Sequence, residues 1–180
     1  MTTAAKKRND TARYLGLDLS LSPGLAVIDV KNRIPTLVYA GSVATSTDDN
    51  DAVRSSVVES FVASNIYAYR PFDLVLREDF IAGRNKRATQ TIFNAWTAAD
   101  RALHTYGYTV ADVKPPLSPT SVKKIITGNG RAEKPEVAEA VRKLLRLPAE
   151  YKFAAGYDDS DAAAVVLAWL IRENLIDTKE

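Results

Sequence analysis

Three short stretches of the sequence, far apart from one another, place carboxylates at the end or the start of an apolar segment. These acidic residues are Asp18, Glu78, Asp79, Asp158, Asp159 and Asp161. Folding can bring the ends of such segments into one site. Oxygen ligands supplied only by Asp and Glu suit hard divalent cations such as Mg2+ or Mn2+, and the main work of such ions in proteins is the handling of phosphate. The acidic stretches therefore predict a metal-dependent reaction on a phosphate group.

The composition restricts the classes of protein that remain open. The chain has no Cys and a single His, His104. A disulfide framework, a thiolate metal site and a cysteine nucleophile are therefore excluded, and one His cannot form a zinc site alone. No apolar run reaches the roughly 18 to 20 residues that cross a bilayer, and residues 1–13 have no apolar signal core. We expect a soluble cytoplasmic protein, of a bacterial cell or a virus-infected host, with one domain over 14–176 after a basic extension over 1–13.

Basic charge is concentrated in the middle of the chain. Residues 77–152 contain 14 Lys or Arg and 8 Asp or Glu, whereas residues 153–180 contain 2 and 6. A basic surface around an acidic, metal-binding cleft suits an enzyme that acts on a polyanion, because Lys and Arg neutralise the distal phosphates. A solvated helical face is the simpler interpretation, and charge alone does not separate the two.

The hydrophobic pattern predicts strands and helices that would position these carboxylates. β-branched and aliphatic runs bounded by turn residues indicate strands, and apolar residues at helical spacing indicate helices. The predicted strands are 14–19, 25–30, 36–43, 72–78 and 108–113, and the predicted helices are 51–69, 88–106, 118–124, 135–145 and 159–173. This order predicts an α/β fold in which a five-stranded mixed sheet has helices on both faces.

Side-chain alternation predicts where the first two acids point. Asp18 should lie on the face of its strand opposite to Leu17, because successive side chains of a strand point to opposite faces. Glu78 shares its parity with Leu76. A carboxylate on a buried face is costly unless it binds a partner or reaches an open cleft. An ordinary turn residue is the simpler interpretation for Asp18 taken alone.

Three acids open the last predicted helix. Asp is a good N-cap and acidic residues favour helix N-termini, so capping explains one of them but not all three. Asp158 and Asp161 are three residues apart and would lie on the same side of the first turn. Asp159 remains an alternative to Asp158 as a ligand. Two divalent ions about 4 Å apart, held by four such carboxylates, stabilise the attacking and leaving oxygens of a phosphodiester displacement without a His or Cys nucleophile.

The segment before the last acidic stretch resembles a known family. It reads Val122-Lys-Lys-Ile-Ile-Thr-Gly-Asn-Gly-Arg-Ala-Glu-Lys134-Pro-Glu-Val137 and continues to Leu144-Leu145. This is similar to the Val-Lys, Gly-x-Gly, Ala-x-Lys, Val and Leu-Leu pattern of the RuvC-type Holliday-junction resolvases, in the RNase H-like superfamily. The resemblance covers about Tyr14 to Arg172. It implies an RNase H-like fold and a Mg2+-dependent endodeoxyribonuclease, with Mn2+ as a substitute and two ions per site, that resolves four-way DNA junctions by paired nicking.

The resemblance also implies roles for particular residues. The metal ligands would be Asp18, Glu78, Asp158 and Asp161, and Lys123 and Lys134 would lie near the scissile phosphate. Phe80 would stack on an unpaired base, although it stands one residue nearer to the glutamate than the aromatic residue of the family. We expect further DNA contacts from Arg84, Lys86, Arg87, Lys124 and Arg131.

The expected assembly is a homodimer whose contact is the predicted helix 88–106, as the resemblance implies. Two sites related by a two-fold axis would cut two strands of a pseudo-symmetric junction. Whether a branch-migration helicase is a further partner stays open. The chain departs from the family in its first turn, where Asp18-Leu-Ser-Leu-Ser-Pro-Gly24 stands in place of Asp-Pro-Gly.

Three other functions compete with a junction resolvase. A less selective flap or branched-DNA nuclease would use the same fold and the same carboxylates. An actin-like ATPase is suggested by Gly16 to Gly24, which resembles a phosphate-binding hairpin, but the chain is too short for two lobes and has no second phosphate motif. A junction-binding protein without catalysis would have no use for carboxylates that repel DNA.

Overall fold

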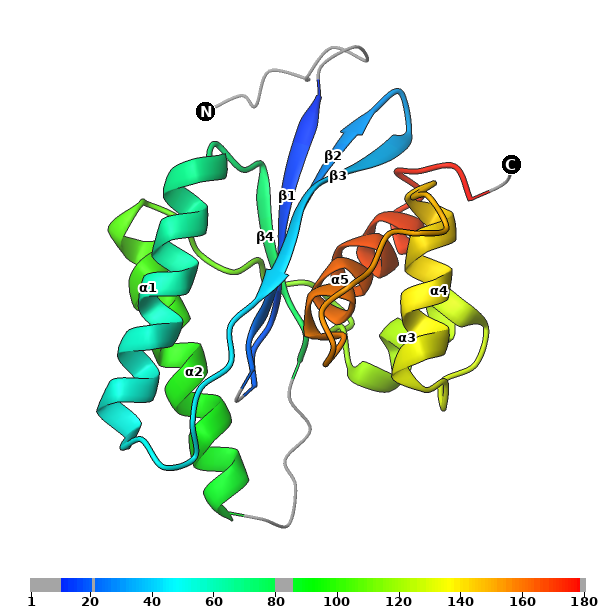
Figure 1. Ribbon diagram of the computed structural model, residues 1–180. Helices are drawn as coiled ribbons and strands as arrows, with labels where there is room; N and C mark the ends of the chain where they lie inside the picture. The colour runs from blue at the N-terminus through cyan, green and yellow to red at the C-terminus, as the bar shows by residue number, and fades with distance from the viewer. Residues whose placement is uncertain (1–10, 21, 80–85, 179–180) are drawn as a thin grey trace.

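A four-stranded sheet separates two layers of helices (Figure 1). The computed structural model describes residues 11–20, 22–79 and 86–178. The strands are β1 (Ala12–Asp18), β2 (Gly24–Lys31), β3 (Ile34–Ser42) and β4 (Leu74–Arg77), in the spatial order β3-β2-β1-β4. β2 runs antiparallel to β1 and β3, whereas β4 runs parallel to β1. The predicted mixed sheet is confirmed.

The predicted fifth strand, at 108–113, is wrong. The Ala111 amide donates a hydrogen bond of 2.9 Å to the Val75 carbonyl of β4, but this described segment forms no ladder with the sheet. Its side chains nevertheless alternate, because Tyr108 and Val110 pack on one hydrophobic core while Ala111 and Val113 pack on the other. The alternation therefore reflects packing between two cores, and it does not require the repeated inter-strand hydrogen bonds that define a strand.

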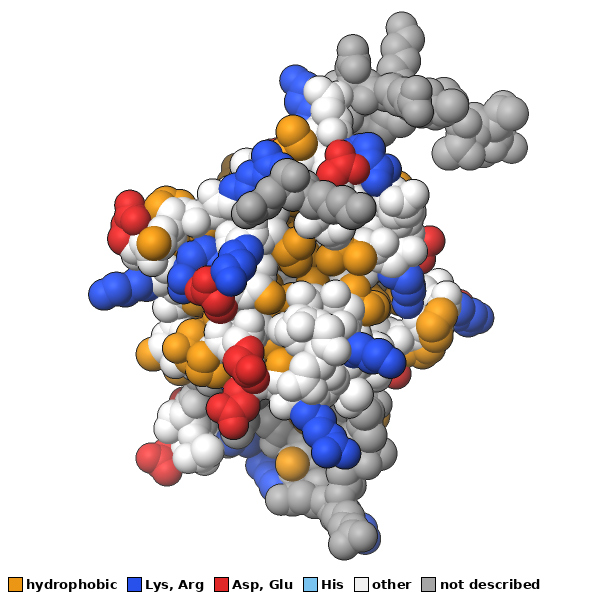
Figure 2. All heavy atoms as spheres, turned by 90° about the vertical axis from the view of Figure 1, so that its right-hand side faces the viewer, with side chains coloured by type: hydrophobic (Ala, Val, Ile, Leu, Met, Phe, Trp, Pro, Cys, Tyr) orange, Lys and Arg blue, Asp and Glu red, His pale blue; other side chains and the backbone are white. Residues whose placement is uncertain are grey.

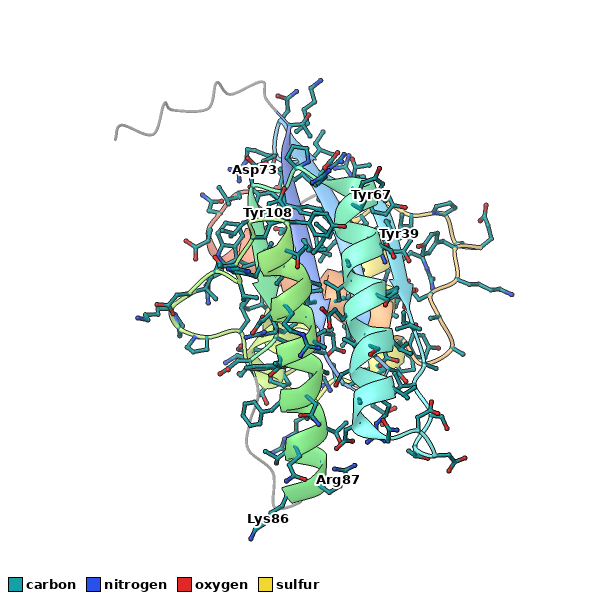
Figure 3. The ribbon with its side chains drawn as sticks, turned by 90° about the vertical axis from the view of Figure 1, so that its left-hand side faces the viewer. Tyr39, Tyr67, Asp73, Lys86, Arg87 and Tyr108 are labelled. Carbon is teal, nitrogen blue, oxygen red and sulfur yellow. The ribbon has the colours of Figure 1, made fainter. Side chains whose placement is uncertain are left out.

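The helices α1 (Asp51–Tyr69) and α2 (Lys86–Thr105) lie side by side on one face of the sheet (Figure 3). Asn50 caps α1 by accepting a hydrogen bond of 3.0 Å from the Val53 amide. Val58 and Val62 bury their side chains, whereas the apolar Val53 of the same helix is 43% exposed. The buried stripe also includes Arg54, so burial along this helix does not simply follow its apolar residues.

The other face is covered by α3 (Pro119–Thr127), α4 (Lys134–Leu144) and α5 (Asp158–Arg172). α5 packs on the sheet and is buried throughout its middle, from Ala162 to Ala168. Ser118 caps α3 by accepting a hydrogen bond from the Ser121 amide. No helix among the described residues is both long and apolar enough to span a membrane.

The two ends of the predicted domain lie close to the first and last residues that the structure describes. Residues 1–10 of the predicted N-terminal extension lie outside the described residues, and its last two residues, Ala12 and Arg13, already belong to β1. At the other end Ile176 is 3% exposed, and the Asp177 amide donates a hydrogen bond of 3.0 Å to the Arg33 carbonyl. The chain is therefore packed against the sheet layer almost to its C-terminus.

Candidate metal centre

The ends of two parallel strands place the first two predicted acids at the same edge of the sheet. Leu17 of β1 pairs with Arg77 of β4, so Asp18 and Glu78 are the next residues along each strand. The Glu78 amide donates a hydrogen bond of 3.2 Å to the Leu17 carbonyl. Both acids have the parity of Leu76, which packs with α5, and the opposite parity to Leu17, which packs with α1 and α2. The predicted side-chain directions agree with this packing.

Two glycines allow the first turn of α5 to reach this edge. Gly24 pairs with Asp18 across the first two strands, and a Cβ added to it would stand 1.9 Å from the carbonyl oxygen of Asp158. A Cβ added to Gly16 would stand 2.3 Å from the carbonyl oxygen of Ala162. Both conflicts are with backbone atoms, so a side chain at either position would push the helix away. Glycine within a strand is the sequence signal of such close approach, and our sequence prediction did not use it.

A cluster of carboxylates results from this approach. Asp18, Asp158 and Asp161 each offer one oxygen, and the three oxygens lie within 4.8 Å of one another. Glu78 lies near enough that repulsion by Asp18 and Asp161 contributes to raising its pKa. The four predicted ligands are therefore brought together. A set of hard, negatively charged oxygens at this spacing fits a divalent cation of the Mg2+ or Mn2+ class.

Asp159 does not join this cluster. Its side chain is 4% exposed, and both of its oxygens accept hydrogen bonds from the Ala154 amide, at 3.1 and 3.0 Å. One of the two oxygens also accepts a hydrogen bond of 2.9 Å from the Ser160 amide. Both oxygens thus face the chain that precedes α5. Of the two alternatives for the fourth ligand, this geometry favours Asp158.

Two lysines border the cluster. Nζ of Lys134 lies 2.8 Å from Oδ1 of Asp158 and 3.3 Å from Oδ2 of Asp161, and it donates a hydrogen bond of 2.9 Å to the Gly156 carbonyl. Burial lowers the pKa of Lys134, but its bonds to the two carboxylates outweigh that effect and raise it. Lys123 of α3 lies near enough for its charge to oppose the rise in the pKa of Asp161. The Gly156 carbonyl was missed by the sequence prediction, because no side-chain pattern signals a backbone acceptor.

Burial and mutual repulsion make the carboxyl groups of Asp18, Glu78 and Asp161 retain protons. Burial, with repulsion by Asp161 and Asp158, raises the pKa of Asp18 to about 7. Burial, with repulsion by Asp18 and Asp161, raises the pKa of Glu78 to about 8. Burial likewise raises the pKa of Asp161. Near neutral pH a cation that enters the site must therefore displace protons, so its affinity should increase with pH.

We expect the metal-free protein to lose stability as the pH rises from about 6 to about 8.5. Asp18 and Glu78 have higher pKa values in the folded than in the unfolded chain, so the folded protein binds more protons over this range. The free energy of unfolding then falls with increasing pH, until the pH passes the two folded pKa values. Asp51, whose pKa is lowered by its arginine partners, contributes only at more acidic pH. Thermal melting in EDTA across this pH range measures the effect.

The control for this expectation is Glu78→Gln, which removes one of the titrating groups and should flatten the dependence on pH. Added Mg2+ should restore stability mainly at the alkaline end, where the carboxyl groups are ionised. A melting temperature that increases with pH in EDTA would contradict the raised pKa values.

The predicted DNA-contacting residues are only partly described. Phe80 and Arg84 lie outside the described residues. Lys86 and Arg87 begin α2 at its lower end in Figure 3, the end of the molecule that also holds the turn between β1 and β2 in Figure 1. Nη1 and Nη2 of Arg87 donate hydrogen bonds of 2.9 and 2.7 Å to the carboxylate of Asp51, so this arginine also connects α2 to α1.

Further basic residues lie on the side of the molecule that carries α3 and α4. Lys124 of α3 and Arg131, just before α4, are exposed as a DNA contact requires. Figure 2 shows that Lys and Arg side chains on this side are interspersed with acidic and neutral ones. The basic excess of the middle of the chain therefore forms no continuous surface on the face that this view presents.

The sequence matches a family model along most of its length. The model is described as crossover junction endodeoxyribonuclease RuvC, and it matches residues 14–169. A relative of that description from Polynucleobacter necessarius is 33% identical over 156 residues, which is 86% of each chain. Another, from Thermobifida fusca, is 32% identical over 162 residues, which is 89% of this chain and 85% of the relative.

Solved structures show the same relationship. Thermus thermophilus RuvC is 25% identical and superposes with a TM-score of 0.72 over 91% of this chain and 97% of its own. The structure of the same bacterial protein in complex with a Holliday junction substrate gives a TM-score of 0.74. A yeast mitochondrial Holliday junction resolvase, at 13% identity and a TM-score of 0.63, shares the fold.

Proposed function

The chain belongs to the RuvC family of crossover junction endodeoxyribonucleases, and from this membership we propose how its own residues cut DNA. It is an endonuclease that resolves Holliday junctions, and its family depends on a metal. One observation supports the assignment of the chemistry to particular residues. The oxygens of Asp18, Asp158 and Asp161 lie within 4.8 Å of one another, beside Glu78.

Asp18, Glu78, Asp158 and Asp161 hold two Mg2+ ions, for which Mn2+ can substitute. Ions bound there supply charge stabilisation to the attacking and the leaving oxygen of the phosphodiester. Two of the ligands stand at the ends of paired strands and two in the first turn of a buried helix, so rigid elements hold all four. Such preorganisation keeps the ligand geometry from relaxing when the substrate binds.

Lys134 and Lys123 supply the positive charge that the scissile phosphate meets beside the carboxylates. Lys134 reaches the cluster from the first turn of α4, and Lys123 approaches it from α3. An ammonium group beside a phosphate oxygen forms a charge-assisted hydrogen bond that strengthens as negative charge develops there. These two lysines therefore act on the reacting phosphate, whereas the more exposed basic residues bind the DNA backbone.

We expect Lys134→Ala to lower the rate of cleavage far more than the affinity for the junction. The loss of rate should be about a hundredfold, because the ammonium group acts where charge develops in the transition state. Single-turnover cleavage of a labelled junction in Mg2+ and gel-shift titration in Ca2+ measure the two quantities separately. Lys143→Ala is the matched control, since Lys143 lies on the same helix, its side chain is 73% exposed, and it pairs with Glu139. Equal losses of rate and affinity would indicate that Lys134 only binds the phosphate backbone of the DNA.

The active form is a homodimer that contacts through α2 and carries two sites. Support comes from Phe93 of that helix, which is 48% exposed and packs edge-on against Trp96, with 5.8 Å between the ring centroids. Exposed aromatic side chains of this kind are common at the centre of protein interfaces. A two-fold axis would present two sites to the two strands of a four-way junction, which suits paired nicking. Sedimentation equilibrium of the purified protein tests the dimer.

The DNA is held by Lys86, Arg87, Lys124 and Arg131, and by Phe80 and Arg84 in the segment outside the described residues. Arg87 also bonds Asp51 of α1, and this bond fixes the start of α2. Contacts between basic side chains and DNA phosphates fix the orientation of the DNA and weaken with added salt.

Cleavage of three substrates tests the proposed selectivity. A mobile four-way junction, a flap and a linear duplex of the same sequences are incubated with the protein in Mg2+ or in EDTA. We expect paired nicks in the junction only, and none in EDTA. Equal cutting of all three substrates in Mg2+ would instead favour a less selective branched-DNA or flap nuclease. Binding of the junction without cutting in Mg2+ would favour a non-catalytic binding protein.

A further inference from the structure

Asp159 is a buried carboxylate that the proposed metal chemistry does not use. It is 4% exposed, and its two oxygens accept three hydrogen bonds from the amides of Ala154 and Ser160. A buried carboxylate is costly unless it is hydrogen-bonded, and bonds from backbone amides to an ionised carboxylate are strong. The side chain is therefore committed to the backbone of the segment that leads into α5.

This segment is a turn held closed at both ends. The Tyr157 amide donates a hydrogen bond of 2.9 Å to the Ala154 carbonyl, and Oγ of Ser160 donates one of 2.8 Å to the Tyr157 carbonyl. Tyr157 has a φ of 62°, in the left-handed region. A residue with a side chain adopts that conformation only where surrounding contacts hold it. The bonds of Asp159 to the other end of the turn are among those contacts.

The same turn carries an acceptor for the ammonium group of Lys134. The Gly156 carbonyl accepts a hydrogen bond of 2.9 Å from Nζ of Lys134. Nζ also lies 2.8 Å from Oδ1 of Asp158 and 3.3 Å from Oδ2 of Asp161. Three oxygens thus hold the ammonium group, and the turn supplies the one that does not belong to the carboxylate cluster.

We propose that Asp159 is a positioning residue, which acts on the Ala154 amide to set the turn 154–157 so that the Gly156 carbonyl holds Lys134 over the cluster. This rests on the proposed function of Lys134 and deepens it. Asp159 then has no part in binding the metal, although it stands between two residues that do. Because Asp159 orients Lys134 and not a ligand, it should affect the reaction through that lysine and leave the affinity for the ion nearly unchanged.

The test uses Asp159→Asn, with Asp158→Asn as the matched control. Asparagine keeps the size of the side chain, but its NH2 group replaces an acceptor with a donor that faces the Ala154 amide. The control removes the same charge from the neighbouring residue, which is a proposed ligand. Should Asp159→Asn fail to fold, Asp159→Ser replaces it in every measurement, because the hydroxyl still accepts one amide bond.

Ion binding without DNA separates positioning from ligation. Calorimetric titration with Mn2+ should give Asp159→Asn an affinity within about threefold of the parent, because Asp159 contacts no proposed ligand oxygen. Asp158→Asn removes a proposed ligand and should lose more than about tenfold. If Asp159→Asn loses as much affinity as Asp158→Asn, then Asp159 is a ligand and the proposal is overturned.

The chemical reactivity of Lys134 measures how firmly its ammonium group is held, and this measurement does not depend on cleavage of DNA. Acetylation of the metal-free protein by an activated acetate ester, followed by peptide mass spectrometry, compares Lys134 with Lys143 as an internal reference. In Asp159→Asn the ammonium group should be held less firmly, and its relative rate of acetylation should rise several-fold. An unchanged relative rate would overturn the proposal, even if the parent protein proved not to cut junctions.

A double-mutant cycle tests whether Asp159 acts through Lys134. Asp159→Asn should slow single-turnover cleavage about tenfold in the parent and less than about twofold in the Lys134→Ala background, because the second variant has already lost the group that is positioned. An equal loss in both backgrounds would show that Asp159 acts independently of Lys134. Absence of cleavage in the parent would refute the proposed function, and acetylation would then decide the inference.

Discussion

Asp161→Asn is expected to abolish detectable Mg2+-dependent cutting of a four-way junction and to leave binding of the junction intact, because it removes one carboxylate from the cluster. Asp161 offers an oxygen within 4.8 Å of those of Asp18 and Asp158, and it lies one helical turn after the latter. Asparagine keeps the shape but loses the charge that balances a divalent ion. We expect a loss of about a thousandfold in the single-turnover rate on a labelled mobile junction.

Binding of the junction by this variant is measured by gel shift, and Asp112→Asn serves as the control. Asp112 carries the same charge, has a side chain that is 82% exposed, and pairs with Lys114 outside the carboxylate cluster. The control should cut at the rate of the parent. Full activity of Asp161→Asn would remove Asp161 from the ligand set, whereas joint loss of cutting and binding would indicate that the variant disturbs the DNA surface instead.

Gly24→Ala should reduce both the stability of the protein and its activity. The added Cβ would stand 1.9 Å from the carbonyl oxygen of Asp158, 2.3 Å from its carbonyl carbon and 2.9 Å from the Asp159 amide nitrogen. These are backbone atoms, so the first turn of α5 must move away from β2. Overpacking of a core costs about 1–3 kcal/mol, and a displacement of about 1 Å at a catalytic site can cost about a hundredfold in rate. Thermal melting and junction cleavage measure the two effects.

Gly41→Ala is the matched control for this substitution. Gly41 also lies in the sheet, but a Cβ there would meet the end of the Tyr39 side chain, which can turn aside. We expect a smaller loss of stability and no loss of cleavage. If Gly24→Ala melted and cut like the parent, the close approach of α5 to β2 would not be needed to assemble the site.

Much of this architecture could be predicted because its signals are local. Asn50 and Ser118 each accept a hydrogen bond from the amide three residues ahead, so these helix starts depend only on neighbouring residues. The parity of Asp18 and Glu78 followed from alternation within single strands. The pattern from Val122 to Leu145 carried the family resemblance, which the match over residues 14–169 confirms.

Other features depend on contacts between distant residues. The β-branched and aliphatic run at 108–113 predicted a fifth strand, but only the position of this segment relative to β4 decides whether a ladder forms. Arg87 was expected to contact DNA, and its bond to Asp51 joins residues 36 positions apart in the sequence. The buried face of α1 likewise depends on the helix beside it, since its apolar residues extend around more than one side.

Residue types and their local spacing are enough to show which side chains could bind a metal and on which side of their strands or helix they lie. The different roles of the acids in the last helix depend on contacts between segments of the folded chain. Helical spacing makes Asp158 and Asp161 neighbours, but it does not state where Asp159 finds its partner. That partner is the Ala154 amide, which faces Asp159 because the chain before α5 folds back as a turn. The position of α5 itself depends on Gly16 and Gly24, because backbone atoms of the helix occupy the space where their side chains would stand.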